Sequence, residues 1–153
     1  MVDGAKVMHR ENKFSDVVVD GLFAGVLAGL VMAAYLAITA VVHSEMPGVL
    51  FSRFHPAEAA SPWTGFLLHL AVSGVYGLLY GCLYYLACTL PRLVIFPRRA
   101  LALGIGYGAV LFSLAWYILL PASASPLLQI PYWDFGLAHL VYGLVVGWRF
   151  GRI

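Results

Sequence analysis

The hydrophobic positions of this chain gather in four long runs that are almost free of charged residues, and polar or proline-rich segments separate these runs. A bilayer core about 30 Å thick takes about 20 helical residues to cross, so each run predicts one membrane-spanning helix. The predicted spans cover residues 21–42, 63–88, 100–120 and 132–149. We therefore expect an all-α integral membrane four-helix bundle.

The segments between the runs are rich in helix breakers. Prolines number three between residues 43 and 62, two between 91 and 99, and three between 121 and 131, which is typical of loops. We interpret residues 1–153 as a single transmembrane domain that carries an N-terminal segment at 1–19.

Three local patterns add detail to this outline. Ser61 followed by Pro62 predicts an N-cap and first turn for the second helix. Asp134 is placed to cap or complement the positive end of the fourth helix. The apolar residues from Val49 to Phe54 predict a short segment that lies on the membrane interface.

The amino-acid composition supports a membrane protein. Of 153 residues, 62% are hydrophobic and 10% are charged, whereas about a quarter of the residues in a soluble domain carry a charge. The formal net charge of +2 is small and spread along the chain, which argues against a nucleic-acid-binding surface.

The basic residues predict an orientation. Eight of the nine flank the spans on one side, namely Lys6, Arg10, Lys13, Arg92, Arg98, Arg99, Arg149 and Arg152, and Arg53 lies on the other. Cytoplasmic flanks carry the excess of Lys and Arg. We therefore expect both termini and the segment 1–19 in the cytoplasm, and the loop 43–62 outside.

Small residues recur every fourth position in all four spans. These candidate helix-packing residues are Gly21, Gly25 and Gly29, then Ser73, Gly77 and Gly81, then Gly104 and Gly108, and finally Gly143 and Gly147. Residues four apart form one ridge of a helix, and small side chains on such a ridge let helix backbones approach closely in lipid. The pattern predicts a close-packed bundle.

The second and fourth spans share a repeat. His69 follows Trp63 by six residues, and His139 follows Trp133 by six. Both histidines begin a ladder of small residues, which suggests two helical hairpins related by duplication. Because both helices run in the same direction, the histidines should lie at one depth, about 9 Å below the tryptophans at 1.5 Å per residue.

Two histidines at one level allow several interpretations. They could ligate a b-type haem between them, or either could bind the magnesium of a chlorophyll. They could equally form hydrogen bonds across helices to Ser73, Tyr76, Tyr142 or a backbone carbonyl. Tyr76 and Tyr80 lie deep in their span, so they are expected to face another helix or a bound quinone, carotenoid or lipid.

The loop at 43–62 offers further donors in His43, Glu45, His55 and Glu58. Their spacing matches no compact metal site, and we predict none.

The motifs LLHLAVSGVYGLLY from Leu67 to Tyr80, HLVYGLVVG from His139 to Gly147 and the opening GLFAGVLAGLVMAA together resemble an uncharacterised family of small four-helix bacterial membrane proteins, similar to the YagU-like proteins. The resemblance implies four spans and a bacterial inner-membrane location. It implies no established activity.

The spans lack the charged relays of pumps and transporters, and the chain lacks a nucleophile with a matching base, so we do not expect an enzyme. We expect a non-catalytic accessory subunit that packs against larger subunits of an energy-transducing, respiratory or photosynthetic membrane complex. The alternative is a small electron-transfer subunit with one b-type haem between His69 and His139. A homo-oligomer packed through the glycine ladders is a third interpretation.

Overall fold

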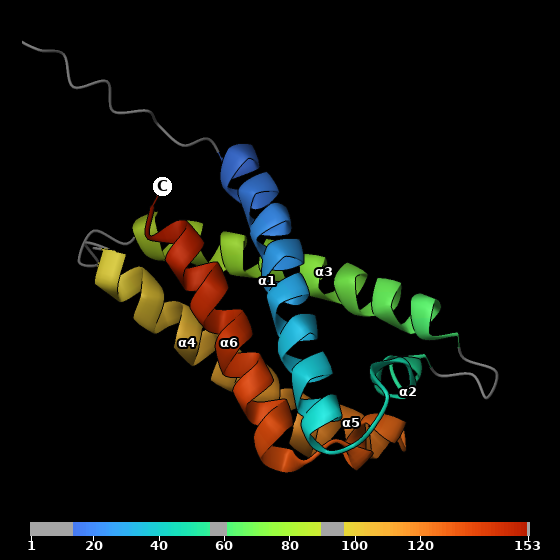
Figure 1. The fold of residues 1–153 in the computed structure, drawn as a ribbon. Helices are drawn as coiled ribbons and strands as arrows, with labels where there is room; N and C mark the ends of the chain where they lie inside the picture. The colour runs from blue at the N-terminus through green and yellow to red at the C-terminus, as the bar shows by residue number, and fades with distance from the viewer. Residues whose placement is uncertain (1–13, 56–60, 90–96, 153) are drawn as a thin grey trace, which may run out of the picture.

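The computed structural model describes residues 14–55, 61–89 and 97–152, and all regular structure within these residues is helical. The order is α1 (Phe14–Val42), α2 (Pro47–Ser52), α3 (Pro62–Thr89), α4 (Pro97–Leu114), η1 (Ala115–Leu119), α5 (Leu120–Ala122), η2 (Pro126–Gln129) and α6 (Tyr132–Phe150), shown in Figure 1. The segment η1 is a π-helix and η2 is a 3₁₀ turn.

Within the described residues, three helices are long and apolar enough to cross a membrane: Phe14–Val42, Pro62–Thr89 and Arg99–Ala122. A helix satisfies its own backbone hydrogen bonds, as the interior of a bilayer requires. The all-α fold and a membrane location are thus supported. Helix α6 has 19 residues and includes Asp134, His139 and Arg149, and it is not among the three, so the count of four spans stays a prediction.

Several predicted boundaries are corrected. Helix α1 begins at Phe14, so residues 14–19 belong to it and only 1–13, which lie outside the described residues, remain of the predicted N-terminal segment. Helix α4 begins at Pro97, a residue well suited to a first turn. By contrast, the starts of α3 at Pro62 and α6 at Tyr132 agree with the sequence.

The long loop contains the short helix α2, where the sequence predicted an interfacial segment. Leu50 is buried while Val49 is half exposed, so α2 has an apolar inner face. A Cβ atom at Gly65 would collide with the carbonyl of Phe51. Gly65 therefore allows α2 to lie directly against the first turns of α3.

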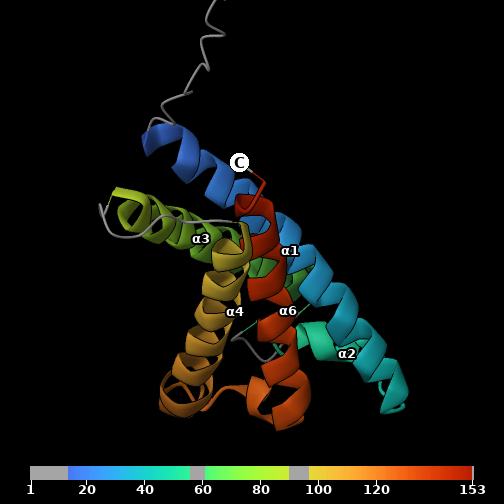
Figure 2. The same ribbon diagram turned by 90° about the vertical axis from the view of Figure 1, so that its left-hand side faces the viewer.

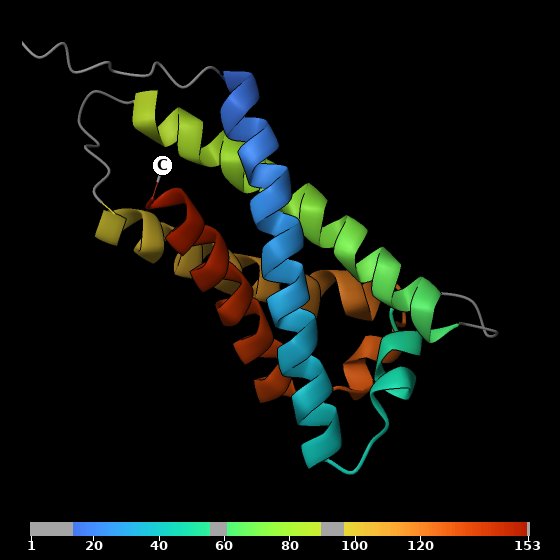
Figure 3. The ribbon, with the colours of Figure 1, turned by 45° about the horizontal axis from the view of Figure 1, so that its top comes forward.

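The long helices form two antiparallel pairs. Helix α1 crosses α3, as Figures 1 and 3 show, and α4 lies alongside α6, while α1 also contacts α6. Helices α3 and α4 are consecutive in the chain but diverge from one another (Figure 2).

The predicted ladders lie at the two crossings. A Cβ atom at Gly25 would lie 2.7 Å from the Cα of Gly77, and one at Gly104 would lie 2.6 Å from the Cα of Gly147. The contact between α1 and α3 also includes Gly21, Gly29, Ser73 and Gly81. The contact between α4 and α6 also includes Gly108 and Gly143. Each pair is therefore held at a backbone separation that any side chain would increase.

Two polar side-chain contacts join helix ends. Arg149 lies 3.4 Å from Asp20, which places the start of α1 beside the end of α6, and His43 Nε2 lies 2.7 Å from Asp134 Oδ2 at the opposite end. The expectation that Asp134 caps α6 needs correction, because the N-cap is Pro131 and has no side-chain cap. Asp134 lies in the first turn of α6, where a carboxylate complements the positive helix end as the other half of the expectation stated, and it binds His43.

Candidate functional site

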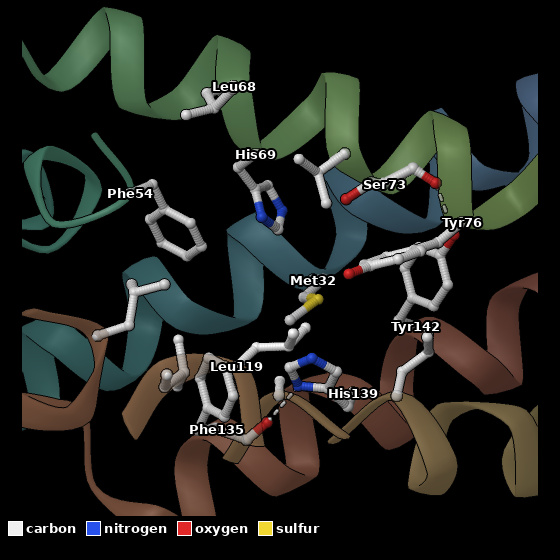
Figure 4. A pocket seen from close by; sticks show the side chains of 15 residues that line it. Met32, Phe54, Leu68, His69, Ser73, Tyr76, Leu119, Phe135, His139 and Tyr142 are labelled. Carbon is white, nitrogen blue, oxygen red and sulfur yellow. Dashed lines mark hydrogen bonds between the residues drawn. The ribbon is translucent and has the colours of Figure 1, made fainter. Parts of the chain in front are cut away.

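The two histidines singled out by the sequence line one cavity of about 200 Å³. His69 comes from α3 and His139 from α6, while Met32 of α1 and Tyr142 of α6 complete the central wall (Figure 4). The cavity therefore lies between the two helix pairs, where the packing of neither pair can fill it.

The His69 side chain connects α3 to α1. It is 5% exposed, and its Nε2–H donates to the backbone carbonyl of Gly29 at 3.0 Å. The ring also meets Phe54 edge to face, with 4.9 Å between ring centroids. The sequence left open whether His69 binds a cofactor or forms a hydrogen bond across helices. The structure shows the second, a bond to a backbone carbonyl of α1.

His139 is arranged differently. Its Nδ1–H donates to the carbonyl of Phe135, one turn earlier in α6, at 2.8 Å. A carbonyl only accepts, so the proton of the neutral ring lies on Nδ1 and Nε2 carries a free lone pair. The ring is 8% exposed, and no described residue forms a hydrogen bond with Nε2.

Tyrosine hydroxyls join the helix pairs around this cavity. Tyr142 donates to the carbonyl of Ser73 at 2.7 Å, and Tyr107 donates to the carbonyl of Tyr76 at 2.8 Å. Near the other end of α3, the Tyr80 hydroxyl donates to the carbonyl of Ala100 at 3.0 Å. The sequence predicted that Tyr80 faces another helix or a bound molecule, and its hydroxyl bonds to another helix. The sequence missed Tyr107, whose position near the middle of a span was the available signal.

The cavity reaches the outer surface of the bundle on one side. Its lining includes Leu68 and Val72 of α3 and Leu119 of η1, and their exposed fractions are 39%, 42% and 44%. A molecule held between the histidines could therefore extend from the cavity into the surrounding lipid.

A second hollow of about 560 Å³ follows the diverging faces of α3 and α4. Leu83 and Ala87 line it from α3, and Ala102, Gly106 and Val110 line it from α4. We refer to this hollow as the α3–α4 groove. Its lining is mostly apolar, like a lipid-facing surface, and also includes Arg99.

Three polar residues of the long loop bind each other or α6. Arg53 forms a two-pronged ion pair with Glu45, and His43 binds Asp134. His55 takes part in a contact of its own, and Glu58 lies outside the described residues. Within the described part of the chain, no three His, Cys, Asp or Glu side chains gather as a metal site would require.

The haem hypothesis depends on the space between the histidines. Cavities that hold drug-sized ligands have volumes of about 300–1,000 Å³, which exceeds the 200 Å³ found here. Figure 4 shows the Met32 side chain between the two imidazoles. His69 also commits its Nε2 to Gly29. A porphyrin would require these side chains to separate, so the cavity as described does not fit one.

Comparisons of this chain with known protein families, with curated proteins and with solved structures found no match in any of the three. The resemblance to YagU-like proteins stays a prediction.

Proposed function

We propose that this protein is a non-catalytic accessory subunit of a larger membrane complex and that the α3–α4 groove receives a transmembrane helix of a partner subunit. The observation that carries the proposal is the position of Gly106. Within the described chain, a Cβ atom added at Gly106 would meet nothing within 4 Å.

Gly106 differs from the other glycines of the long helices, since each of those would place a Cβ atom within 4 Å of the chain. Small residues in membrane helices mark places where another backbone approaches. Ala102 lies one turn before Gly106 and lines the same groove. The two residues form a small-residue ridge that the described residues leave uncovered.

The interior polar groups support a structural role. The hydroxyls of Tyr80, Tyr107 and Tyr142 and the Nε2–H of His69 all donate to backbone carbonyls of other helices. Such bonds contribute about 0.6 to 2 kcal/mol each in membranes. These groups hold the bundle together and leave little polar chemistry for a reaction.

The proposal includes the finer architecture expected from the sequence: four spans, both termini in the cytoplasm, and a bacterial inner membrane. It also includes duplicated hairpins. A Cβ atom at Gly25 would have the carbonyl oxygen of Ser73 and the Cα and nitrogen of Gly77 as its nearest atoms. One at Gly104 would have the corresponding atoms of Gly143 and Gly147. The two helix pairs therefore repeat one contact, as a duplication would produce.

The test is co-purification in mild detergent from the membranes of the source organism. Wild-type protein should retain a larger membrane subunit, and Gly106→Leu should lose most of it because the side chain fills the ridge. Ala34→Leu, at an exposed position of α1, is the matched control and should retain it. A partner held equally by Gly106→Leu, or a complex that contains this chain alone, would contradict the proposal.

A second candidate is the electron-transfer subunit with one b-type haem. It is favoured by the convergence of His69 and His139 on one cavity, and it requires the cavity to widen. The absorption spectrum of the same purified sample tests it, because ligated haem gives a Soret band.

A further inference from the structure

The Nε2 atom of His139 carries a free lone pair, and no described residue donates a hydrogen bond to it. Among the described residues every fully buried side-chain nitrogen or oxygen has a hydrogen-bond partner, so Nε2 of the 8% exposed His139 is open to the cavity that this residue lines. Native structures usually satisfy such an atom with water or a ligand. Because Nε2 can only accept while Nδ1 holds the proton, the missing partner must carry an O–H or N–H group.

We propose that the cavity between His69 and His139 binds an apolar molecule with one hydroxylated aromatic ring, a phenol or a hydroquinone, whose hydroxyl donates to His139 Nε2. This site is separate from the α3–α4 groove, so the inference stands independently of the accessory role.

The size of the cavity favours a single ring. An apolar protein cavity of about 150 Å³ accommodates benzene, and the cavity here measures about 200 Å³. One ring with small substituents therefore fits, whereas a porphyrin does not.

The lining suits an aromatic ring with one polar end. The Phe54 and Phe135 side chains line the cavity with several aliphatic residues, and the Phe135 and His139 rings lie 4.5 Å apart between centroids. Figure 4 shows the Tyr76 hydroxyl directed into the same space. A phenol hydroxyl can donate to His139 and accept from Tyr76.

The side of the cavity that opens to the outside of the bundle leaves room for an apolar tail on the ligand. Leu68, Val72 and Leu119 line the cavity and are partly exposed on the outside of the bundle. A ring held at His139 can thus extend an alkyl chain through this opening into the lipid, which also gives the ligand its route of entry.

The test measures binding of 4-heptylphenol and of heptylbenzene, which lacks the hydroxyl, to the full-length protein in detergent. His139→Asn keeps an amide donor for the Phe135 carbonyl but places no acceptor at the position of Nε2. We expect this substitution to weaken 4-heptylphenol binding at least about tenfold and to change heptylbenzene binding less than about twofold. Partition into detergent cancels, because each probe is compared between two proteins in the same micelles.

A second variant locates the site even if His139→Asn folds poorly. Ala115 lines the cavity, and Ala115→Phe should fill it and reduce binding of both probes at least about tenfold. Unchanged 4-heptylphenol binding in either variant would overturn the proposal. So would a wild-type protein that binds neither probe, as expected of a cavity that holds only water, or a Soret band in the purified protein.

Discussion

Tyrosine hydroxyls inside the bundle donate to backbone carbonyls that belong to other helices. Tyr142 reaches Ser73, Tyr107 reaches Tyr76, and Tyr80 reaches Ala100. Lipid offers no water to these hydroxyls, and the carbonyl oxygens have a second lone pair beyond their helical bond. Each bond therefore fixes one helix against another at a specific residue.

Replacing Tyr142 by Phe tests this role. The ring is 2% exposed and stays in place, so the variant loses only the 2.7 Å bond from α6 to α3. We expect the free energy of unfolding in mixed micelles to fall by about 0.6–1.7 kcal/mol.

Tyr117→Phe is the matched control, because Tyr117 is 63% exposed and binds another surface hydroxyl, that of Tyr132. It should change the unfolding free energy by less than Tyr142→Phe. Equal losses in the two variants would contradict the interhelical role of Tyr142.

For individual residues, the sequence predicts which side chains lie in the interior better than it predicts their hydrogen-bond partners. The repeat of Trp63–His69 and Trp133–His139 indicated both histidines as paired interior residues, and both line one cavity. It could not predict that His69 binds another helix while His139 binds its own. That difference depends on side-chain rotamers and helix register, which a single sequence does not encode locally.

At the scale of helices, the glycine ladders decide which faces meet. Helix α1 lies against α3 through Gly25 and Gly77, and α4 lies against α6 through Gly104 and Gly147. Without a hydrophobic driving force between helices in lipid, close backbone packing supplies the attraction. The contacts should therefore tolerate no added atom.

A pair of identical substitutions tests this. A Cβ atom at Gly77 would lie 2.6 Å from the backbone nitrogen of Gly25, whereas one at Gly106 would meet nothing within 4 Å. We expect Gly77→Ala to lower the free energy of unfolding by about 1–3 kcal/mol, as overpacking does. Gly106→Ala should leave it unchanged or raise it through better helix propensity. Thermal unfolding in detergent that showed equal effects would contradict this packing.

The sequence predicts the long helices well and the irregular elements poorly. The π-helix η1 is an example: the N–H of Leu120 donates to the carbonyl of Ala115, five residues earlier, just before Pro121. A proline in a regular α-helix clashes with the carbonyl four residues before it, and a wider turn accommodates it. Pro121 predicted an end to the helix, but the chain continues to Ala122 through this turn.

At the scale of the whole molecule, the two tightly packed pairs border two of the hollows found among the described residues. The cavity with His69 and His139 lies between the pairs, and the α3–α4 groove lies where α3 and α4 diverge. The sequence predicted compact packing but not these hollows, because a hollow depends on the angles at which helices cross. Both functional proposals rest on these spaces.

Site-specific photo-crosslinking tests the accessory role most directly. Val110 is 63% exposed and lines the α3–α4 groove, whereas Phe23 of α1 is 68% exposed and lies outside the groove. A photoreactive amino acid at position 110 should give one discrete adduct with a different membrane subunit in the native membrane, and at position 23 it should give lipid adducts. Lipid adducts alone at both positions, or an adduct at 110 with a second copy of this chain, would contradict the account.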